Sequence, residues 1–68
     1  MLELMRINPA GSKSTAIKLA RKSDATVAYV AKSKLTKKWV TIQCFSQCAI
    51  EEMEKEGPAC WDKLIRIK

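Results

Sequence analysis

Basic residues are the side chains of this sequence whose type and clustering point to a chemical role, and they are unevenly distributed. Residues 1–50 carry nine Lys or Arg and two acidic residues, whereas residues 51–68 carry four basic and five acidic residues. A small protein with one strongly basic part projects a positive field, whose usual partners are phosphate backbones or acidic protein surfaces. The charge pattern therefore predicts a class of partner.

The densest basic cluster surrounds a predicted hairpin turn. Nucleic-acid binding needs several cations on one surface, because affinity comes from the release of condensed counterions as phosphates are neutralised. Lysine outnumbers arginine ten to three, which favours backbone neutralisation over the reading of guanine, for which arginine is the usual bidentate donor. The alternative interpretation is a solvated surface that binds nothing specifically. The predicted binding residues are Lys32, Lys34, Lys37 and Lys38 around the turn, and Lys18, Arg21 and Lys22 on a neighbouring element.

Trp39 adds an aromatic ring to this basic region. In a strand it alternates with Val40, so it is predicted to be partly exposed if a helix covers the Val40 face. An exposed ring among lysines stacks on an unpaired base at a gain of about 1–3 kcal/mol per base. The alternative is that Trp39 packs within the structure, as large aromatic side chains more often do.

Cysteine and glutamate are the other residues whose types suit metal binding or catalysis. The chain has no His, so the pair Cys44-x3-Cys48 lacks the further ligands of a structural zinc site, and no obvious base activates a nucleophile at neutral pH. Cys44, Cys48 and Cys60 are predicted to be buried free thiols, with a Cys48–Cys60 disulfide or a disulfide between chains as alternatives. We therefore expect a non-catalytic protein without metal or cofactor. Four glutamates surround the predicted helix instead of converging, as on a solvated helix surface: Glu51, Glu52, Glu54 and Glu56.

One helix and several strands must position these side chains. Ser46 is the predicted N-cap of a helix over residues 47–56, which Gly57 and Pro58 are predicted to end. Its narrow apolar stripe predicts that the helix lies on a sheet. Alternation and β-branched residues predict strands over residues 2–7, 25–32, 38–45 and 63–68, with the middle two joined as a hairpin.

Residues 14–22 carry two conflicting signals. Their composition and Ser14 favour a helix, yet Ile17 and Leu19 lie two residues apart, which places them on one face of a strand. Because hydrophobic periodicity is the stronger of the two signals, a strand is predicted. The predicted fold is a single α+β domain over residues 1–68, in which an antiparallel sheet of 3–5 strands carries one helix on one face.

Two hypotheses of function from different classes fit these features. The first is a small non-catalytic protein that binds nucleic acid or a nucleoprotein complex through lysine–phosphate contacts, with low specificity and strong salt dependence. The second is an inhibitor that binds a host nucleic-acid-processing machine by protein–protein contacts. Small basic domains of phages and mobile elements often act in this way on a CRISPR effector, an RNA polymerase or a nuclease. The lysines would then contact an acidic protein surface, with Trp39 or Leu35 as anchors.

Location and assembly are constrained less directly. No apolar run approaches the ~18 residues that span a bilayer, and the first residues lack the layout of a signal peptide. The odd number of cysteines fits a reducing compartment. We therefore expect a cytoplasmic protein without membrane contact, and an edge strand at residues 2–7 or 63–68 is predicted to allow a homodimer.

Overall fold

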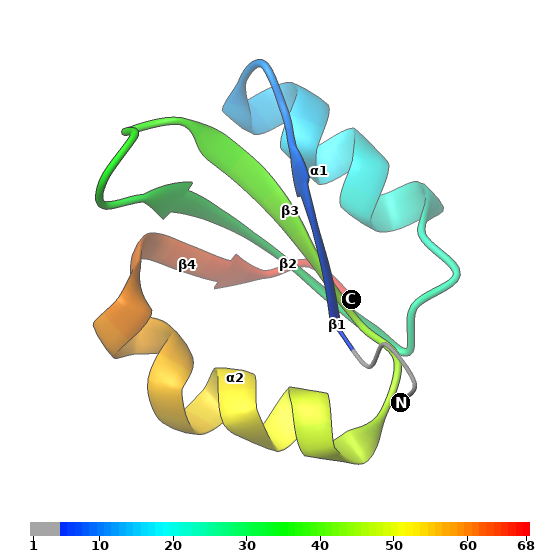
Figure 1. The fold of residues 1–68 in the computed structure, drawn as a ribbon. Helices are drawn as coiled ribbons and strands as arrows, with labels where there is room; N and C mark the ends of the chain where they lie inside the picture. The colour runs from blue at the N-terminus through cyan, green and yellow to red at the C-terminus, as the bar shows by residue number, and fades with distance from the viewer. Residues whose placement is uncertain (1–4) are drawn as a thin grey trace.

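The computed structural model describes residues 5–68, which form a four-stranded sheet with a helix on each face (Figure 1). The sheet order is β1-β3-β2-β4, and every neighbouring pair is antiparallel. The predicted α+β class is confirmed, and the sheet carries two helices where one was predicted. The elements are β1 (Met5–Pro9), α1 (Lys13–Lys22), β2 (Val27–Ser33), β3 (Trp39–Cys44), α2 (Gln47–Cys60) and β4 (Trp61–Arg66).

The strands lie close to their predicted positions. The strands predicted at 25–32, 38–45 and 63–68 are observed as β2, β3 and β4, each shifted by one or two residues. The strand predicted at 2–7 is observed as β1, and residues 2–4 lie outside the described part of the chain. β1 and β4 are the edges of the sheet. No helix among the described residues is long and apolar enough to cross a membrane.

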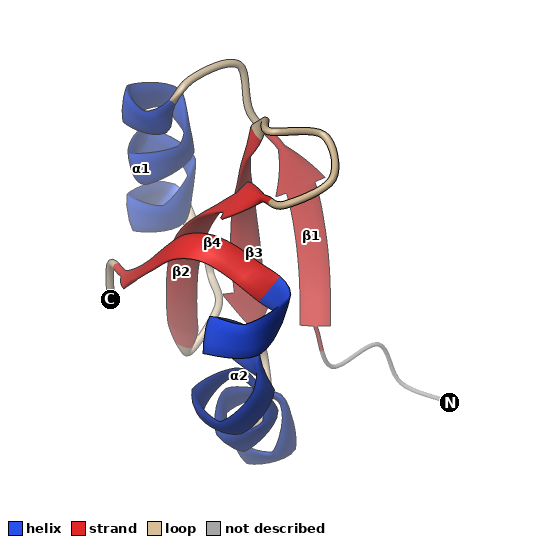
Figure 2. Ribbon diagram, turned by 90° about the vertical axis from the view of Figure 1, so that its left-hand side faces the viewer, coloured by secondary structure: helices blue, strands red, loops and turns tan. Residues whose placement is uncertain are grey.

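The two helices lie on opposite faces because of how the strands are connected. The units β1-α1-β2 and β3-α2-β4 each step over one strand in the same lateral direction, but β1 and β3 run in opposite directions. Two crossovers of the same hand must then place their helices on opposite faces of the sheet. Figures 1 and 2 show this arrangement, with the sheet between α1 and α2.

Side-chain alternation gives the sheet an α1 face and an α2 face, named after the helix that packs on each. The α2 face buries large side chains, including Tyr29 and Ile42, under Ile50 and Met53 of the helix. The α1 face buries small ones, and its cluster is formed by Ala16, Ala20, Ala28 and Val30. Tyr29 therefore lies in the core, and the predicted alternation of Trp39 and Val40 in β3 is confirmed.

α1 corrects the prediction of a strand at residues 14–22. The helix begins after Ser12, whose Oγ accepts a hydrogen bond from the Thr15 amide at 3.3 Å, so the cap is Ser12 and not Ser14. Ala16 and Ala20, one turn apart, are fully buried against the sheet. The Ile17 and Leu19 spacing is misleading because an alanine stripe makes the contact, which leaves Leu19 40% exposed.

Close approach between α1 and the sheet is fixed by one buried hydrogen bond. Thr41 of β3 is fully buried, and its Oγ1 donates to the Ala16 carbonyl at 2.9 Å. An alanine side chain leaves that carbonyl within reach of the sheet. Thr41 thus satisfies its own buried hydroxyl while it ties the helix to β3.

α2 begins as predicted, and its predicted end is wrong. Ser46 caps the helix through its Oγ, but the helix runs four residues past position 56, through Gly57 and Pro58. Gly57 has no positive φ. A Cβ at this buried position would lie 2.7 Å from Cδ2 of Leu64, so a larger residue would force the Leu64 side chain of β4 to move, and glycine allows the close contact between α2 and β4. The helix closes with a bond from the Trp61 amide to the Gly57 carbonyl.

The predicted hairpin between β2 and β3 is confirmed, and residues 34–38 form its loop. The Ser33 carbonyl accepts from the Lys37 amide at 2.9 Å, and the Ser33 hydroxyl accepts from the Leu35 and Thr36 amides at 3.3 Å. Lys37 adopts a positive φ of 62°. These bonds hold the hairpin tip in one conformation.

Candidate nucleic-acid interface

The outer side of α1 presents basic residues. The helix contains four basic residues and no acid. Because Ala16 and Ala20 point at the sheet, positions 18 and 22 lie on the opposite side of the helix, towards solvent. Lys18, Arg21 and Lys22 are all exposed. The structure therefore brings three of the predicted binding residues together on one helix surface.

The hairpin presents the second basic group. Lys34, Lys37 and Lys38 are exposed, and Lys32 is half-buried in β2. Lys34 Nζ donates a 2.6 Å hydrogen bond to the Ala59 carbonyl near the C-terminal end of α2. A cation is favourable there because helix carbonyls carry partial negative charge. Lys34 thus ties the hairpin to α2, whereas the tip presents Lys37 and Lys38 to solvent.

The two basic groups come nearest each other at the end of the sheet where α1 begins. The first turn of α1 and the hairpin lie at the same end of the sheet (Figure 1). There, the Ala10 amide donates to the Trp39 carbonyl at 2.9 Å, and Lys13 Nζ lies 5.7 Å from the centroid of the Trp39 ring. Lys22 lies roughly 14 Å further along the helix axis, at 1.5 Å per residue. The resulting basic surface, defined as the outer side of α1 together with the hairpin tip, is elongated.

Trp39 is less open to solvent than a sheet with only one covered face would leave it. α2 does cover the Val40 face, but α1 covers the other face, on which Trp39 lies. Trp39 is half-buried and packs against the small-residue cluster under α1. Lys13 then lies over its ring at cation–π distance. Only the part of the ring that α1 and Lys13 leave open is accessible to a base.

Two cations lie beside aromatic rings on this face, and neither contact was predicted from the sequence. The contact of Lys13 with Trp39 was not predicted because α1 was not recognised as a helix, so its first turn could not be placed beside Trp39. Arg6 pairs in register with Gln43 on the edge strand, and its guanidinium carbon lies 5.9 Å from the centroid of the Phe45 ring. The pairing of β1 with β3, which creates this contact, has no signal in either segment alone.

The α2 side of the molecule carries the opposite charge. Four glutamates and one lysine lie on α2, as the uneven sequence charge implies. α1 and α2 cover opposite faces of the sheet (Figure 2). The sheet therefore separates the basic side that carries α1 from the acidic side that carries α2. Within residues 5–68, no group of three or more metal-ligating side chains converges.

The cysteines differ from the prediction. All three are free, but only Cys44 is buried, whereas Cys48 and Cys60 are exposed on α2. The prediction of buried thiols is therefore wrong for two of the three cysteines. Burial raises the pKa of the Cys44 thiol, which keeps it protonated and unreactive at neutral pH.

Comparison with known proteins adds no relationship: no protein-family model, curated protein or solved structure matches the chain. Function must therefore be inferred from the chemistry of the surface. The two features available are the elongated basic surface and the acidic side opposite it.

Proposed function

We propose that this protein is a small non-catalytic binding protein that engages nucleic acid or a nucleoprotein complex through phosphate contacts of its lysines. The observation that carries the proposal is α1, which has four basic residues, no acid, and an outer side that presents Lys18, Arg21 and Lys22 to solvent. Clustered cations on a rigid element neutralise several phosphates at once, which releases the counterions condensed on the nucleic acid.

The hairpin tip extends the same contact. Lys37 and Lys38 belong to the loop at the end of the sheet where α1 begins (Figure 1), so a long phosphate backbone that follows α1 would continue past this end to reach them. Lysine neutralises phosphates as a point charge and reads no base. Binding is therefore expected to depend weakly on sequence and strongly on salt.

The test is binding to labelled single- and double-stranded DNA and RNA at salt concentrations between ~50 and 200 mM. The double variant Lys18→Gln/Lys22→Gln should weaken binding about tenfold. It should also reduce the slope of log affinity against log salt concentration by about two, because each lost phosphate contact reduces that slope by about one. The matched control is Lys55→Gln/Lys63→Gln, which removes the same charge from α2 and β4 and should leave affinity nearly unchanged.

A further variant separates phosphate contacts from stacking. Trp39→Leu keeps apolar packing under α1 but removes the aromatic ring. A loss of affinity for single-stranded oligonucleotides alone would show that Trp39 stacks on bases. An equal change in affinity for single- and double-stranded oligonucleotides would limit its role to packing. If no oligonucleotide binds at ~50 mM salt, the proposal fails, and the lysines would instead face an acidic protein surface, as the inhibitor hypothesis requires.

A further inference from the structure

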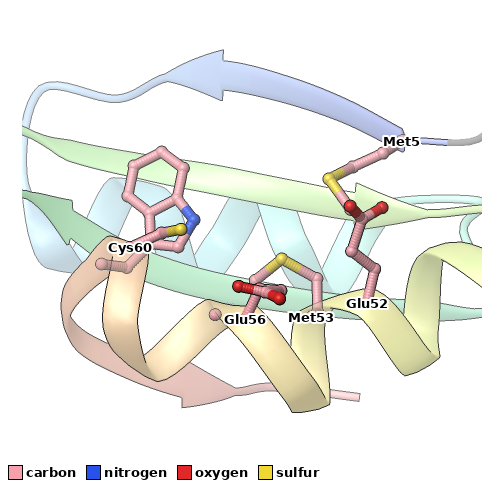
Figure 3. Close-up of a pocket in the computed structure, with 7 residues that line it drawn as sticks. Met5, Glu52, Met53, Glu56 and Cys60 are labelled. Atoms are coloured by element: carbon pink, nitrogen blue, oxygen red, sulfur yellow. The ribbon is translucent and has the colours of Figure 1, made fainter.

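An apolar groove lies between α2 and β1 on the acidic side of the molecule. Its walls include Met5 of β1, Met53 of α2 and Trp61 of β4, and its volume is about 180 Å³. Two exposed glutamates one helical turn apart, Glu52 and Glu56, also line it. Figure 3 shows Met5 extending from β1 towards Glu52, with Met53 and Glu56 projecting from α2.

The size and lining of this groove restrict its occupant. Pockets for small molecules usually enclose ~300–1,000 Å³, so a groove of about 180 Å³ is better matched by a single side chain. Apolar walls favour an apolar side chain, and the glutamates favour positive charge beside it. The fitting occupant is an apolar residue flanked by cations.

The hairpin tip of the same chain has this chemistry. Leu35 is 92% exposed, and the next most exposed large apolar residue among residues 5–68, Ile7, is 47% exposed. Lys34 precedes Leu35, and Lys37 and Lys38 follow it closely. Because hydrogen bonds to Ser33 fix the tip, little conformational freedom is lost when it binds.

We propose that Leu35 of one copy inserts into the α2–β1 groove of a second copy, with the tip lysines facing Glu52 and Glu56. A chain does not fill its own groove in this way, because Leu35 stays exposed while Lys34 holds the hairpin against Ala59. The basic α1 side would repel the tip, so the acidic groove is the complementary surface on this molecule. The contact joins two different surfaces and is therefore heterologous, which allows assemblies larger than a dimer.

The first test is the molar mass of the full chain, measured by sedimentation equilibrium between about 10 μM and about 1 mM protein. Average mass should rise with concentration, and it should fall at higher salt because the contact is partly ionic. A monomer throughout this range would overturn the proposal.

Two pairs of variants locate the contact. Leu35→Ser should weaken self-association roughly tenfold to hundredfold, from the loss of one buried leucine. Leu19→Ser, at an exposed leucine on α1, is its control and should have no effect. Glu52→Lys/Glu56→Lys should also abolish association, whereas Glu51→Lys/Glu54→Lys makes the same change in net charge away from the groove and should not. Association that survives Leu35→Ser, or that fails equally in the controls, would contradict the proposal.

Mixing the defective variants gives the sharpest result. The Leu35→Ser chain keeps a working groove, and the Glu52→Lys/Glu56→Lys chain keeps a working tip. Their mixture should form a one-to-one pair that neither variant forms alone, and it should not grow further. If the mixture remains monomeric, the tip and the groove are not partners. Far-ultraviolet circular dichroism and urea unfolding of each variant provide the independent check that it is folded.

Discussion

The two faces of the sheet bury different kinds of side chain. On the α2 face, Tyr29 and Ile42 of the sheet meet Ile50 and Met53 of the helix. On the α1 face, alanines of the helix meet Ala28 and Val30. Hydrophobic stabilisation scales with the apolar area removed from water, so the α2 face supplies most of it. The α1 face supplies close contact instead, which fixes the basic helix in place with little apolar area.

The α2 face therefore supplies most of the stability, whereas the helix on the α1 face carries the basic surface. α1 has no acid to pair with its cations at helical spacing, so Lys18 and Lys22 repel each other, and only Arg21 and Lys22 in the last turn gain from the partial negative charge of the helix C-terminus. Its position depends on the Ser12 cap, the alanine stripe and the bond from Thr41. The repulsion within α1 would be relieved by a bound polyanion, which agrees with the proposed function.

The largest effect is expected on the α2 face. Ile50→Ala removes a buried side chain from the large-residue core and should lower the free energy of unfolding by about 2–4 kcal/mol. A domain of this size has a total of roughly 3–10 kcal/mol, so urea unfolding will show the change clearly. Ile65→Ala, at a residue 37% exposed, is the control. A loss below about 1 kcal/mol for Ile50→Ala would mean that this face is not the main core.

On the α1 face, a larger side chain should lower the stability, whereas on the α2 face a smaller one does. Ala20 is fully buried, so Ala20→Leu should lower the free energy of unfolding by about 1–3 kcal/mol because the larger side chain cannot fit between helix and sheet. Ala59→Leu, at an exposed position in α2, should be nearly neutral in the same urea titration. If Ala20→Leu is tolerated as well as Ala59→Leu, the close contact of α1 is not required.

A smaller effect is expected from the bond that ties α1 to β3. Thr41→Val keeps the shape of the side chain but removes the donor to the Ala16 carbonyl, and it should cost about 1 kcal/mol of unfolding free energy. Amide exchange should also accelerate in α1 more than in α2, because only the first helix loses a contact. Thr26→Val, at an exposed threonine, provides the comparison. Equal exchange changes in both helices would show that the bond has no local role.

The same contrast explains what could be predicted from the sequence. β3 alternates apolar with polar residues, β2 opens with an apolar run rich in β-branched and aromatic side chains, and α2 carries an apolar stripe, so these three elements gave clear signals. α1 buries alanines, which give a weak hydrophobic signal, and its two larger residues are spaced as in a strand. Gly57 was misread because a glycine that caps a helix and a glycine that allows close packing are identical in the sequence.

The candidate sites were predictable to different extents. Charge alone located the exposed lysines, because a lysine is seldom buried. The position of Trp39 under Lys13 depends on α1 and was out of reach once that helix was missed. The groove combines Met5, Met53 and Trp61, which lie near opposite ends of the chain and come together only through the sheet order. The exposure of Leu35 likewise depends on the conformation of the hairpin.

The smallest and most selective effect is expected from alkaline pH, which should act on the α2 face alone. Burial raises the pKa of the Tyr29 hydroxyl above its usual 10.0, the nearby Cys44 adds to this, and burial also raises the pKa of Cys44 above 9.0. The folded state therefore favours both neutral forms. Their contribution is complete below about pH 9 and is lost as the pH rises through the higher folded-state values.

Tyr29→Phe tests this assignment. Within residues 5–68, the Tyr29 hydroxyl is buried and has no hydrogen-bond partner, so its removal should change the free energy of unfolding little at pH 7, or even increase it. Between about pH 9 and 11, however, the variant should lose less stability than the unmodified protein, because only Cys44 is left to ionise on this face. The free energy of unfolding of each protein is measured by urea titration across this pH range. If it falls by the same amount in both proteins, Tyr29 ionises equally easily in the folded and unfolded states. Because the α1 cluster of Ala16, Ala20, Ala28 and Val30 contains no titratable side chain, a pH effect that Tyr29→Phe reduces is a specific probe of the α2 core.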